Sequence, residues 1–298
     1  LTTATIDIDA NVVTNGGDVD LNATTLVDLA TGTSITTTGN AAGEAGGDVD
    51  IDVSGTGTVN LVGALVTTGN ANAAGAGGTG GDVTIDTANG TVSVTAITSD
   101  GGAATTTGNN NGGAAGDVAI NTDSSNIITL NGAISAAGGT PTGTGTPGAG
   151  GNVTFADPVV LATDITITTG ATAGNISFQS TLDSAATDAN TLALTAGTGS
   201  IAFTGAVGSG ATQELGAVTI VSATDVTASS TFEAASLTQT AGTGTTMLDG
   251  VVTTAANVSL TTATIDIDAN VVTNGGDVDL NATTLVDLAT GTSITTTG

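Results

Sequence analysis

The sequence predicts an all-β fold, specifically a right-handed three-sided parallel β-helix (β-solenoid) with about ten coils per 259-residue unit. Three observations predict it. A glycine-led motif with alternating apolar residues recurs along the chain, two further short strands follow the motif, and Gly, Asn or Thr stands between strands. Glycine and asparagine supply the left-handed backbone angles that a sharp corner requires.

The motif is a glycine, a small polar residue and then an apolar-x-apolar strand. In the first instance, we expect the apolar Val19 and Leu21 to point inward and Asp18 and Asp20 to point outward, as alternation in a half-buried strand requires. We expect each motif to begin a coil. The instances are GDVDL at Gly17, GDVDI at Gly47, GDVTI at Gly81, GDVAI at Gly116, GNVTF at Gly151, GNISF at Gly174, GSIAF at Gly199, GAVTI at Gly216, NVSL at Asn257 and GDVDL at Gly276.

Coils of parallel strands stack about 4.8 Å apart, so like side chains form ladders inside the helix. Phe155, Phe178 and Phe203 occupy the same place in three consecutive motifs, and we expect them to stack as an aromatic ladder. Phe232 is expected to lie in the core as well. Immunoglobulin-like sandwiches would show a period near 90 residues, and Thr, Val and Gly disfavour helical repeats.

Residues 1–39 and 260–298 are identical in sequence. We interpret residues 1–259 as one full tandem unit of a continuous β-helix, about 50 Å long, and residues 260–298 as the start of the next unit. The chain is then a window on a longer repetitive polypeptide. A chain in which one end was duplicated artificially is the alternative.

The composition excludes several function classes. The chain has 27 acidic residues, no Lys, Arg or His, and a net charge of −27, which disfavours nucleic acid and anionic membranes as partners. Zinc sites need the His and Cys that are absent, and membrane insertion needs longer apolar stretches. Disorder is disfavoured because 39% of residues are apolar and only 9% are charged. No cofactor is required by these residues, and Ca²⁺ is the one candidate.

Four segments rich in Gly, Ala, Asn and Thr follow the third strand and precede the next motif: residues 40–46, 70–80, 101–115 and 138–150. Placed at one corner, they are expected to form a ridge along one edge of the helix. They are either tolerated loops without a role or a surface for lateral contact between rods, because small side chains allow close backbone approach.

One candidate metal site follows from the motif. Asp18, Asp48, Asp82 and Asp117 occupy the same motif position and should stack, with repulsion of about 1 kcal/mol between neighbours in water. Two interpretations remain open, a solvated acidic face and a Ca²⁺ ladder. A second mixed ladder is expected from Asn22, Asp52, Asp86 and Asn121, stabilised by side-chain amides or by metal.

The GGDVTI and GNVTF strands, together with LTAGTGSIAFTGAVGSG from Leu194 and ASLTQTAGTGTTMLDG from Ala235, carry a resemblance. The chain resembles the repeat regions of giant bacterial β-strand-repeat surface proteins of the filamentous-haemagglutinin kind. The resemblance covers essentially the whole chain. It implies a secreted right-handed β-helix on, or released from, a bacterial cell surface.

We therefore expect a structural protein and not an enzyme: an extracellular rod, fibre, sheath or adhesin stalk of the kind found in biofilms. Its partners would be neighbouring repeats of the same chain and lateral copies of the filament. One alternative is a carbohydrate-active β-helix enzyme, for which only a carboxylate-pair mechanism is available, and no such pair stands apart from the ladders. The other is ice binding by Thr ladders, suggested by SITTTG at Ser34 and DITITTG at Asp164.

Overall fold

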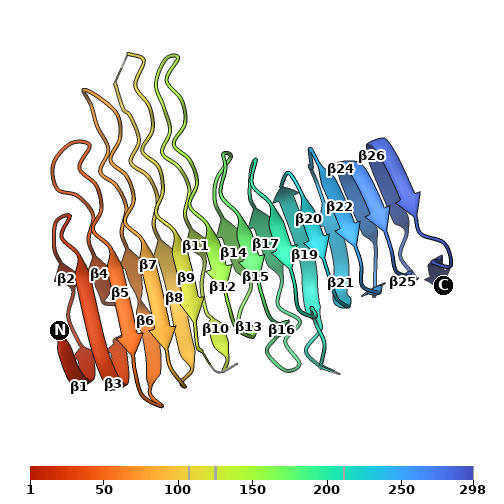
Figure 1. Ribbon diagram of the computed structural model, residues 1–298, viewed down its shortest axis with the longest axis horizontal. Coiled ribbons are helices and arrows are strands. Elements are labelled where there is room, and N and C mark those ends of the chain that lie inside the picture. Colours follow the sequence, from red (N-terminus) through yellow and green to blue (C-terminus); the bar gives the residue numbers. More distant parts are fainter. Residues whose placement is uncertain (107, 124–125, 211, 298) are drawn as a thin grey trace.

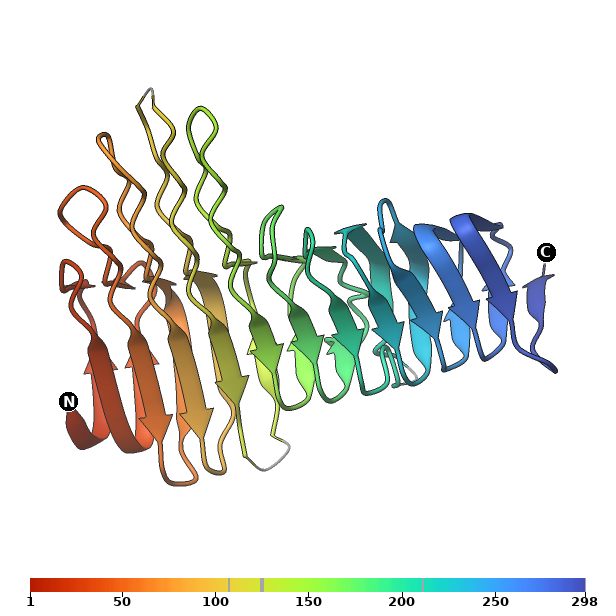
Figure 2. The same ribbon diagram turned by 45° about the horizontal axis from the view of Figure 1, so that its top comes forward.

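The computed structural model describes residues 1–298 apart from 107, 124–125, 211 and 298. The described residues form an all-β fold like that of a parallel β-helix, with 27 strands and no helix. The molecule is elongated, and the chain progresses along the long axis, so that its two termini lie at opposite ends (Figures 1 and 2). Strands inside the stack pair in parallel with strands from the coils before and after them, and this pairing joins the strands into three columns.

The first column contains the strands of the glycine-led motif in the first seven copies. It starts in the first residues of β1, where Thr2 and Thr3 pair with Asn22 and Ala23 of β3, and ends in the second half of β26, around Leu288. Its members are β3 (Val19–Leu29), β5 (Val49–Val53), β7 (Val83–Thr87), β9 (Val118–Asn121), β12 (Val153–Phe155), β15 (Ile176–Phe178), β18 (Ile201–Phe203), β20 (Val226–Ala228), β22 (Thr245–Leu248), β24 (Val258–Ile267) and β26 (Val278–Leu288).

The second column starts around Ile6 and Val27 and ends around Ile294. Several long strands bend at a corner and contribute to two columns, as β3 does here with its second half. The other members are β1 (Thr2–Ile8), β6 (Thr58–Val66), β8 (Val92–Thr98), β10 (Ile128–Leu130), β13 (Val159–Leu161), β16 (Leu182–Ser184), β21 (Phe232–Gln239), β23 (Val252–Thr254), β25 (Val271–Asn274) and β27 (Ile294–Thr297), with a single bridge at Val207.

The third column starts around Val12 and Ile35 and ends around Leu280. It uses the second halves of β6, β8 and β21 and the first halves of β24 and β26. Its remaining members are β2 (Val12–Val13), β4 (Ser34–Thr36), β11 (Ile134–Ser135), β14 (Ile165–Thr168), β17 (Leu192–Thr195) and β19 (Leu215–Ser222).

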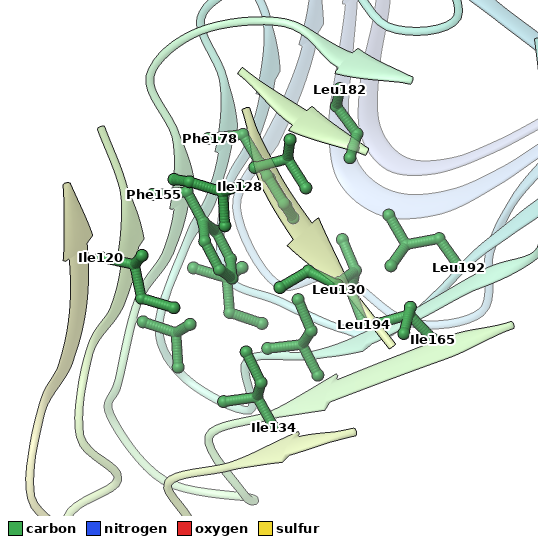
Figure 3. Packing of buried hydrophobic residues seen from close by; sticks show 14 of the residues in the cluster. Ile120, Ile128, Leu130, Ile134, Phe155, Ile165, Phe178, Leu182, Leu192 and Leu194 are labelled. Carbon is green, nitrogen blue, oxygen red and sulfur yellow. The ribbon is translucent and has the colours of Figure 1, made fainter. Parts of the chain in front are cut away.

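The core is a continuous apolar stack between the three columns. Alternate residues of each strand point inward, as in β5, where Val49, Ile51 and Val53 are buried and the two aspartates between them are not. Side chains from the different columns meet in the middle (Figure 3). Because every coil repeats this arrangement, one narrow core runs along the molecule.

The predicted aromatic ladder is present. The rings of Phe155 and Phe178 stack with centroids 5.0 Å apart, and those of Phe178 and Phe203 stack at 5.5 Å. Ala228 takes the next place in the same column, and Phe232, in the second column, meets Phe203 edge-on at 5.6 Å. All four rings are buried, and the spacings lie in the favourable range for aromatic pairs.

The expectation that every motif begins a coil is wrong for the last three copies. The motifs from Gly17 to Gly199 stack in the first column, whereas the strands after Gly216, Asn257 and Gly276 lie in the third column. The physical reason is length: Gly216 follows Gly199 by 17 residues, whereas the shortest coil in the first column, from Leu248 to Ile267, takes 19.

Candidate functional site

The four aspartates of the first ladder lie in register at the start of neighbouring strands. The backbone N–H of Asp48 donates to Oδ1 of Asp18 at 2.9 Å, and that of Asp82 donates to Oδ1 of Asp48 at 2.8 Å. The N–H of Asp117 donates in turn to Oδ1 of Asp82 at 2.7 Å. Each carboxylate therefore binds the backbone of the next coil, which gives the ladder a structural role in joining coils.

Asparagine continues the ladder without its charge. The N–H of Asn152 donates to Oδ1 of Asp117 at 2.7 Å, that of Asn175 to Oδ1 of Asn152 at 3.0 Å, and that of Ser200 to Oδ1 of Asn175 at 2.8 Å. An oxygen acceptor is thus what this corner needs, and either Asp or Asn provides it. The negative charge at Asp18 to Asp117 is extra to that requirement.

The second ladder is also in register, since Asn22, Asp52, Asp86 and Asn121 are successive Cα partners. Nδ2 of Asn121 donates to Oδ1 of Asp86 at 3.2 Å, which is the amide bonding expected for this ladder. Partial burial, followed by the nearby carboxylates of Asp123, Asp52 and Asp50, raises the pKa of Asp86, and the Asn121 amide opposes this shift.

A third row of acidic groups lies between the two ladders. Asp20 and Asp50 are Cα partners on the outward side of β3 and β5. Partial burial is the main cause that raises the pKa of Asp50, and the carboxylates of Asp20 and Asp52 add to it. The first-column face of the N-terminal coils is therefore a dense carboxylate surface, which no Lys or Arg neutralises.

Ca²⁺ binding by Asp18, Asp48, Asp82 and Asp117 stays a prediction. In the part of the chain that the structure describes, no three acidic side chains form a group that could hold an ion. In each of the four carboxylates, one oxygen accepts a hydrogen bond from the backbone N–H of the ladder residue in the next coil, so a cation would bind through the other oxygen and through water.

The four small-residue segments do form a ridge along one edge, as predicted. They rise side by side from the corner between the third and first columns (Figures 1 and 2). Each segment has an outgoing and a returning arm, and hydrogen bonds cross between arms of the same segment and of neighbouring segments. We refer to residues 40–46, 70–80, 101–115 and 138–150, except 107, as the ridge.

One chain of backbone hydrogen bonds crosses the whole ridge. Each N–H in it donates to the next carbonyl at 2.7–2.9 Å, alternating between outgoing and returning arms. It runs from Gly148 to Gly139, Gly113, Gly102, Gly78, Asn70 and finally Glu44. The ridge is therefore a cross-linked backbone bundle, and the close approach that its small residues permit serves contact within the molecule.

Glycine is required where these arms meet. A Cβ on Gly113 would overlap the carbonyl oxygen of Gly78, and a Cβ on Gly102 would overlap that of Asn70. In collagen, too, only glycine fits where backbones crowd together. Glu44 is the only charged residue of the ridge, so the ridge itself is almost neutral, although the aspartate ladder lies at the corner from which it rises.

A hollow of about 360 Å³ lies on the second-column side, beside β16, β19 and β21. Glu214 and Glu233 both line it, with Thr187, Thr212, Thr253 and Asn274 among the other lining residues. The two glutamates therefore line one hollow outside the ladders, and the expectation that no catalytic carboxylate pair stands apart from the ladders stays a prediction. The rarity of glutamate, which occurs at only three positions, is the one sequence signal that sets these residues apart.

The threonine-rich third strands do not present all their hydroxyls to solvent. Thr37, Thr67 and Thr169 are buried at the corner, where each Oγ1 donates to a glycine carbonyl. Those carbonyls belong to Gly47, Gly81 and Gly174 at distances of 2.5, 2.6 and 2.8 Å. One threonine of each TTG thus closes a corner of the coil, which leaves fewer outward hydroxyls for an ice-binding face.

The last coil exposes side chains that are buried in the first copy of the same sequence. Val286, Leu288 and Ile294 are 44%, 44% and 38% exposed. Their counterparts Val27, Leu29 and Ile35 are each 0% exposed, because another coil covers them. We call Val278–Leu288 and Ile294–Thr297 the open face; it is the uncovered end of the strand stack.

Comparisons with known protein families, with curated proteins and with solved structures found no match. Among the described residues, no helix long and apolar enough to cross a membrane is found.

Proposed function

We propose that this chain is part of an extracellular structural rod or filament, a fibre, sheath or adhesin stalk, built from tandem 259-residue units. In this proposal the three columns are the sides of a right-handed three-sided parallel β-helix with about ten coils per unit, and the chain comes from a giant bacterial surface protein. The rod serves by its length and stiffness, and its partners are neighbouring units and lateral copies.

The open face carries this proposal. The same eleven-residue sequence, VDLNATTLVDL, has five buried residues in β3 and none in β26. Burying a Val, Leu or Ile side chain contributes about 1.5–3 kcal/mol, so a further coil on the open face would be strongly stabilised. An open strand edge is otherwise a site for uncontrolled pairing. Stacking more units is the arrangement in which this sequence is covered in every copy.

The acidic composition agrees with a role outside the cell. The chain has no Lys or Arg, so trypsin-like proteases have no bond to cleave. Its corners are closed by backbone-bound Asp and Asn side chains, and its coils have no disulfide to reduce.

The test is to express chains with one, two and four tandem 259-residue units and to image them by cryo-electron microscopy. We expect rods whose length increases by about 50 Å per unit, with a 4.8 Å axial spacing. Particles that stay the same length, or that form separate beads on a string, would contradict the proposal. Circular dichroism on the same samples controls for chains that do not fold.

A further inference from the structure

We infer that each 259-residue unit joins the rod one third of a turn out of step with the unit before it. The open face, in the unit that begins at residue 260, would then be the surface on which the rest of that unit stacks, and successive ridges would project from successive edges. This inference rests on the proposed rod, and it adds the geometry by which units join.

Identical residues of the two copies lie in different columns. Leu21 belongs to the first column, where it pairs with Ile51, but its counterpart Leu280 pairs with Leu260 in the third column. The same shift of column occurs at two further positions in the 39-residue segment that the two copies share. Val27 lies in the second column and its counterpart Val286 in the first, whereas Ile35 lies in the third and its counterpart Ile294 in the second.

The local coil is the same in both copies, so the shift is one of position and not of fold. Val12 pairs with Ile35 in the first copy, and Val271 pairs with Ile294 in the second. Even the corner bond is repeated. The N–H of Ser34 donates to Oδ1 of Asn11 at 3.0 Å, and the N–H of Ser293 donates to Oδ1 of Asn270 at 2.9 Å.

Counting along the first column gives the size of the step. Nine rungs lead from Leu21 to Ile267, and Leu280 then lies two columns further along the same coil. The rungs are Ile51, Ile85, Ile120, Phe155, Phe178, Phe203, Ala228, Leu248 and Ile267. The 259 residues from Leu21 to Leu280 therefore make nine turns and two thirds of a tenth.

The same sequence can lie in a different column because the inward residues of the three columns are alike. Leu21 is covered by Ile51, Val27 by Val59 and Ile35 by Leu65, all of them aliphatic contacts. In the next unit, the counterparts of those three covering residues would lie on Leu280, Val286 and Ile294. The occupant of the open face is thus the continuation of the unit that begins at residue 260, starting with the sequence of residues 40–66 and stacked one column away from its place in the first unit.

The ridge moves with the columns. In the first copy, its segments follow third-column strands such as β4, and they lie at the corner before the first column. The counterpart of β4 is β27, which lies in the second column. The ridge of the following unit would therefore leave from the corner after the second column, and three units would place nearly neutral ridges on all three edges.

Cysteine pairs test the step in the 298-residue chain, which has no cysteine of its own. Ser259 and Asp279 are neighbours in the third column, so Ser259→Cys with Asp279→Cys should form an intramolecular disulfide on oxidation. Asp20→Cys with Asp50→Cys is the matched positive control, because those residues are partners within the first copy.

Asp266→Cys with Asp279→Cys is the pair that a whole-turn step would favour, since it would place Asp279 in the column of Asp266. Peptide mass spectrometry after cleavage at acidic residues identifies the bonds. A cross-link between positions 259 and 279, with none between 266 and 279, supports the inference. The reverse result would overturn it, whether or not rods form.

Cryo-electron microscopy of a three-unit rod tests the ridges. We expect each ridge to turn by one column every 46 Å or so, with the full pattern repeating after about 140 Å. The control is a rod in which each unit contains a second copy of residues 10–16. This insertion adds one side of a coil to each unit and brings the unit to ten full turns, so the ridges of the control rod should all lie on one edge. Ridges on one edge in the unaltered rod would overturn the inference and leave the rod; absence of any rod would overturn both.

Discussion

Phe178 is the best single residue with which to measure the core. Its ring is stacked between Phe155 and Phe203 and is almost fully buried. We predict that Phe178→Ala lowers the free energy of unfolding by about 3–5 kcal/mol, because it leaves a cavity between two fixed coils. Chemical denaturation measures it, with the exposed Val62→Ala as the control. A loss below about 1 kcal/mol would show that the ladder is not a packed unit.

Gly113 tests the ridge in the same way. An added methyl group would overlap the carbonyl oxygen of Gly78, so we predict that Gly113→Ala destabilises the ridge by about 1–3 kcal/mol. Hydrogen exchange should show faster exchange at Gly102 and Gly139, whose amides belong to the same chain of bonds. Gly17→Ala is the control, because the added Cβ would lie 3.6 Å from the nearest atom, which is an ordinary van der Waals contact. Unchanged exchange in the Gly113 variant would contradict the cross-linked bundle.

At the scale of the element, the aspartate ladder combines a structural acceptor with a charge that is not needed for structure. We predict that Asp82→Asn raises the melting temperature, since it keeps an oxygen for the N–H of Asp117 and removes repulsion from Asp48 and Asp117. Asp82→Ala should lower it, because the acceptor is lost. Thermal unfolding of both variants separates the two effects. A lower melting temperature for the Asn variant would mean that the charge itself stabilises the ladder.

The same ladder gives the prediction for Ca²⁺. Cations should raise the melting temperature, because repulsion along Asp18, Asp48, Asp82 and Asp117 is otherwise unbalanced. Melting curves with chelator, with millimolar CaCl₂ and with NaCl at equal ionic strength distinguish specific binding from screening. A rise with Ca²⁺ that exceeds the rise with NaCl favours a bound ion. An unchanged curve from chelator to millimolar Ca²⁺ counts against a specific metal role.

At the scale of the whole molecule, the net charge of −27 predicts an unusual pH dependence. Burial and neighbouring carboxylates raise the folded-state pKa of Asp50, Asp86 and Asp266 above 3.8. The folded state therefore binds protons more tightly than the unfolded state at these groups, and their contribution to stability falls as the pH rises through the folded pKa. We predict that the free energy of unfolding increases as the pH is lowered from 7 to about 4.

One group acts in the opposite sense. The N–H of Thr191 donates to Asp164 and lowers the pKa of that carboxyl, so its contribution is present above the unfolded pKa and is lost as the pH falls through the folded pKa. It does not offset the gain above pH 4. Denaturation across this range measures the effect, and Asp50→Asn with Asp86→Asn should raise stability at pH 7 and flatten the profile. A protein that is most stable at pH 7 would contradict the prediction.

Much of the coil could be predicted from the sequence because inward residues repeat. Phe155, Phe178 and Phe203 hold the same position in successive motifs, which predicted that their rings stack on one another. The same rule predicted the ladder from Asp18 to Asp117. Glu214 and Glu233 could not be paired this way. They lie in different coils, and the residues between them do not repeat, so only the folded chain brings both to one hollow.

The sequence by itself determined the parallel strands, the alternation of core and surface, and the ridge at one edge, because each follows from residues a few positions apart. The tertiary structure alone decided which column each strand enters. Val19 and Val278 have identical neighbours in sequence, yet they lie in different columns. The column that Val278 enters depends on how many corners the chain makes in the 259 residues after Val19. The corners differ too little in local sequence to be counted from the sequence, so their number is known only from the stacked coils.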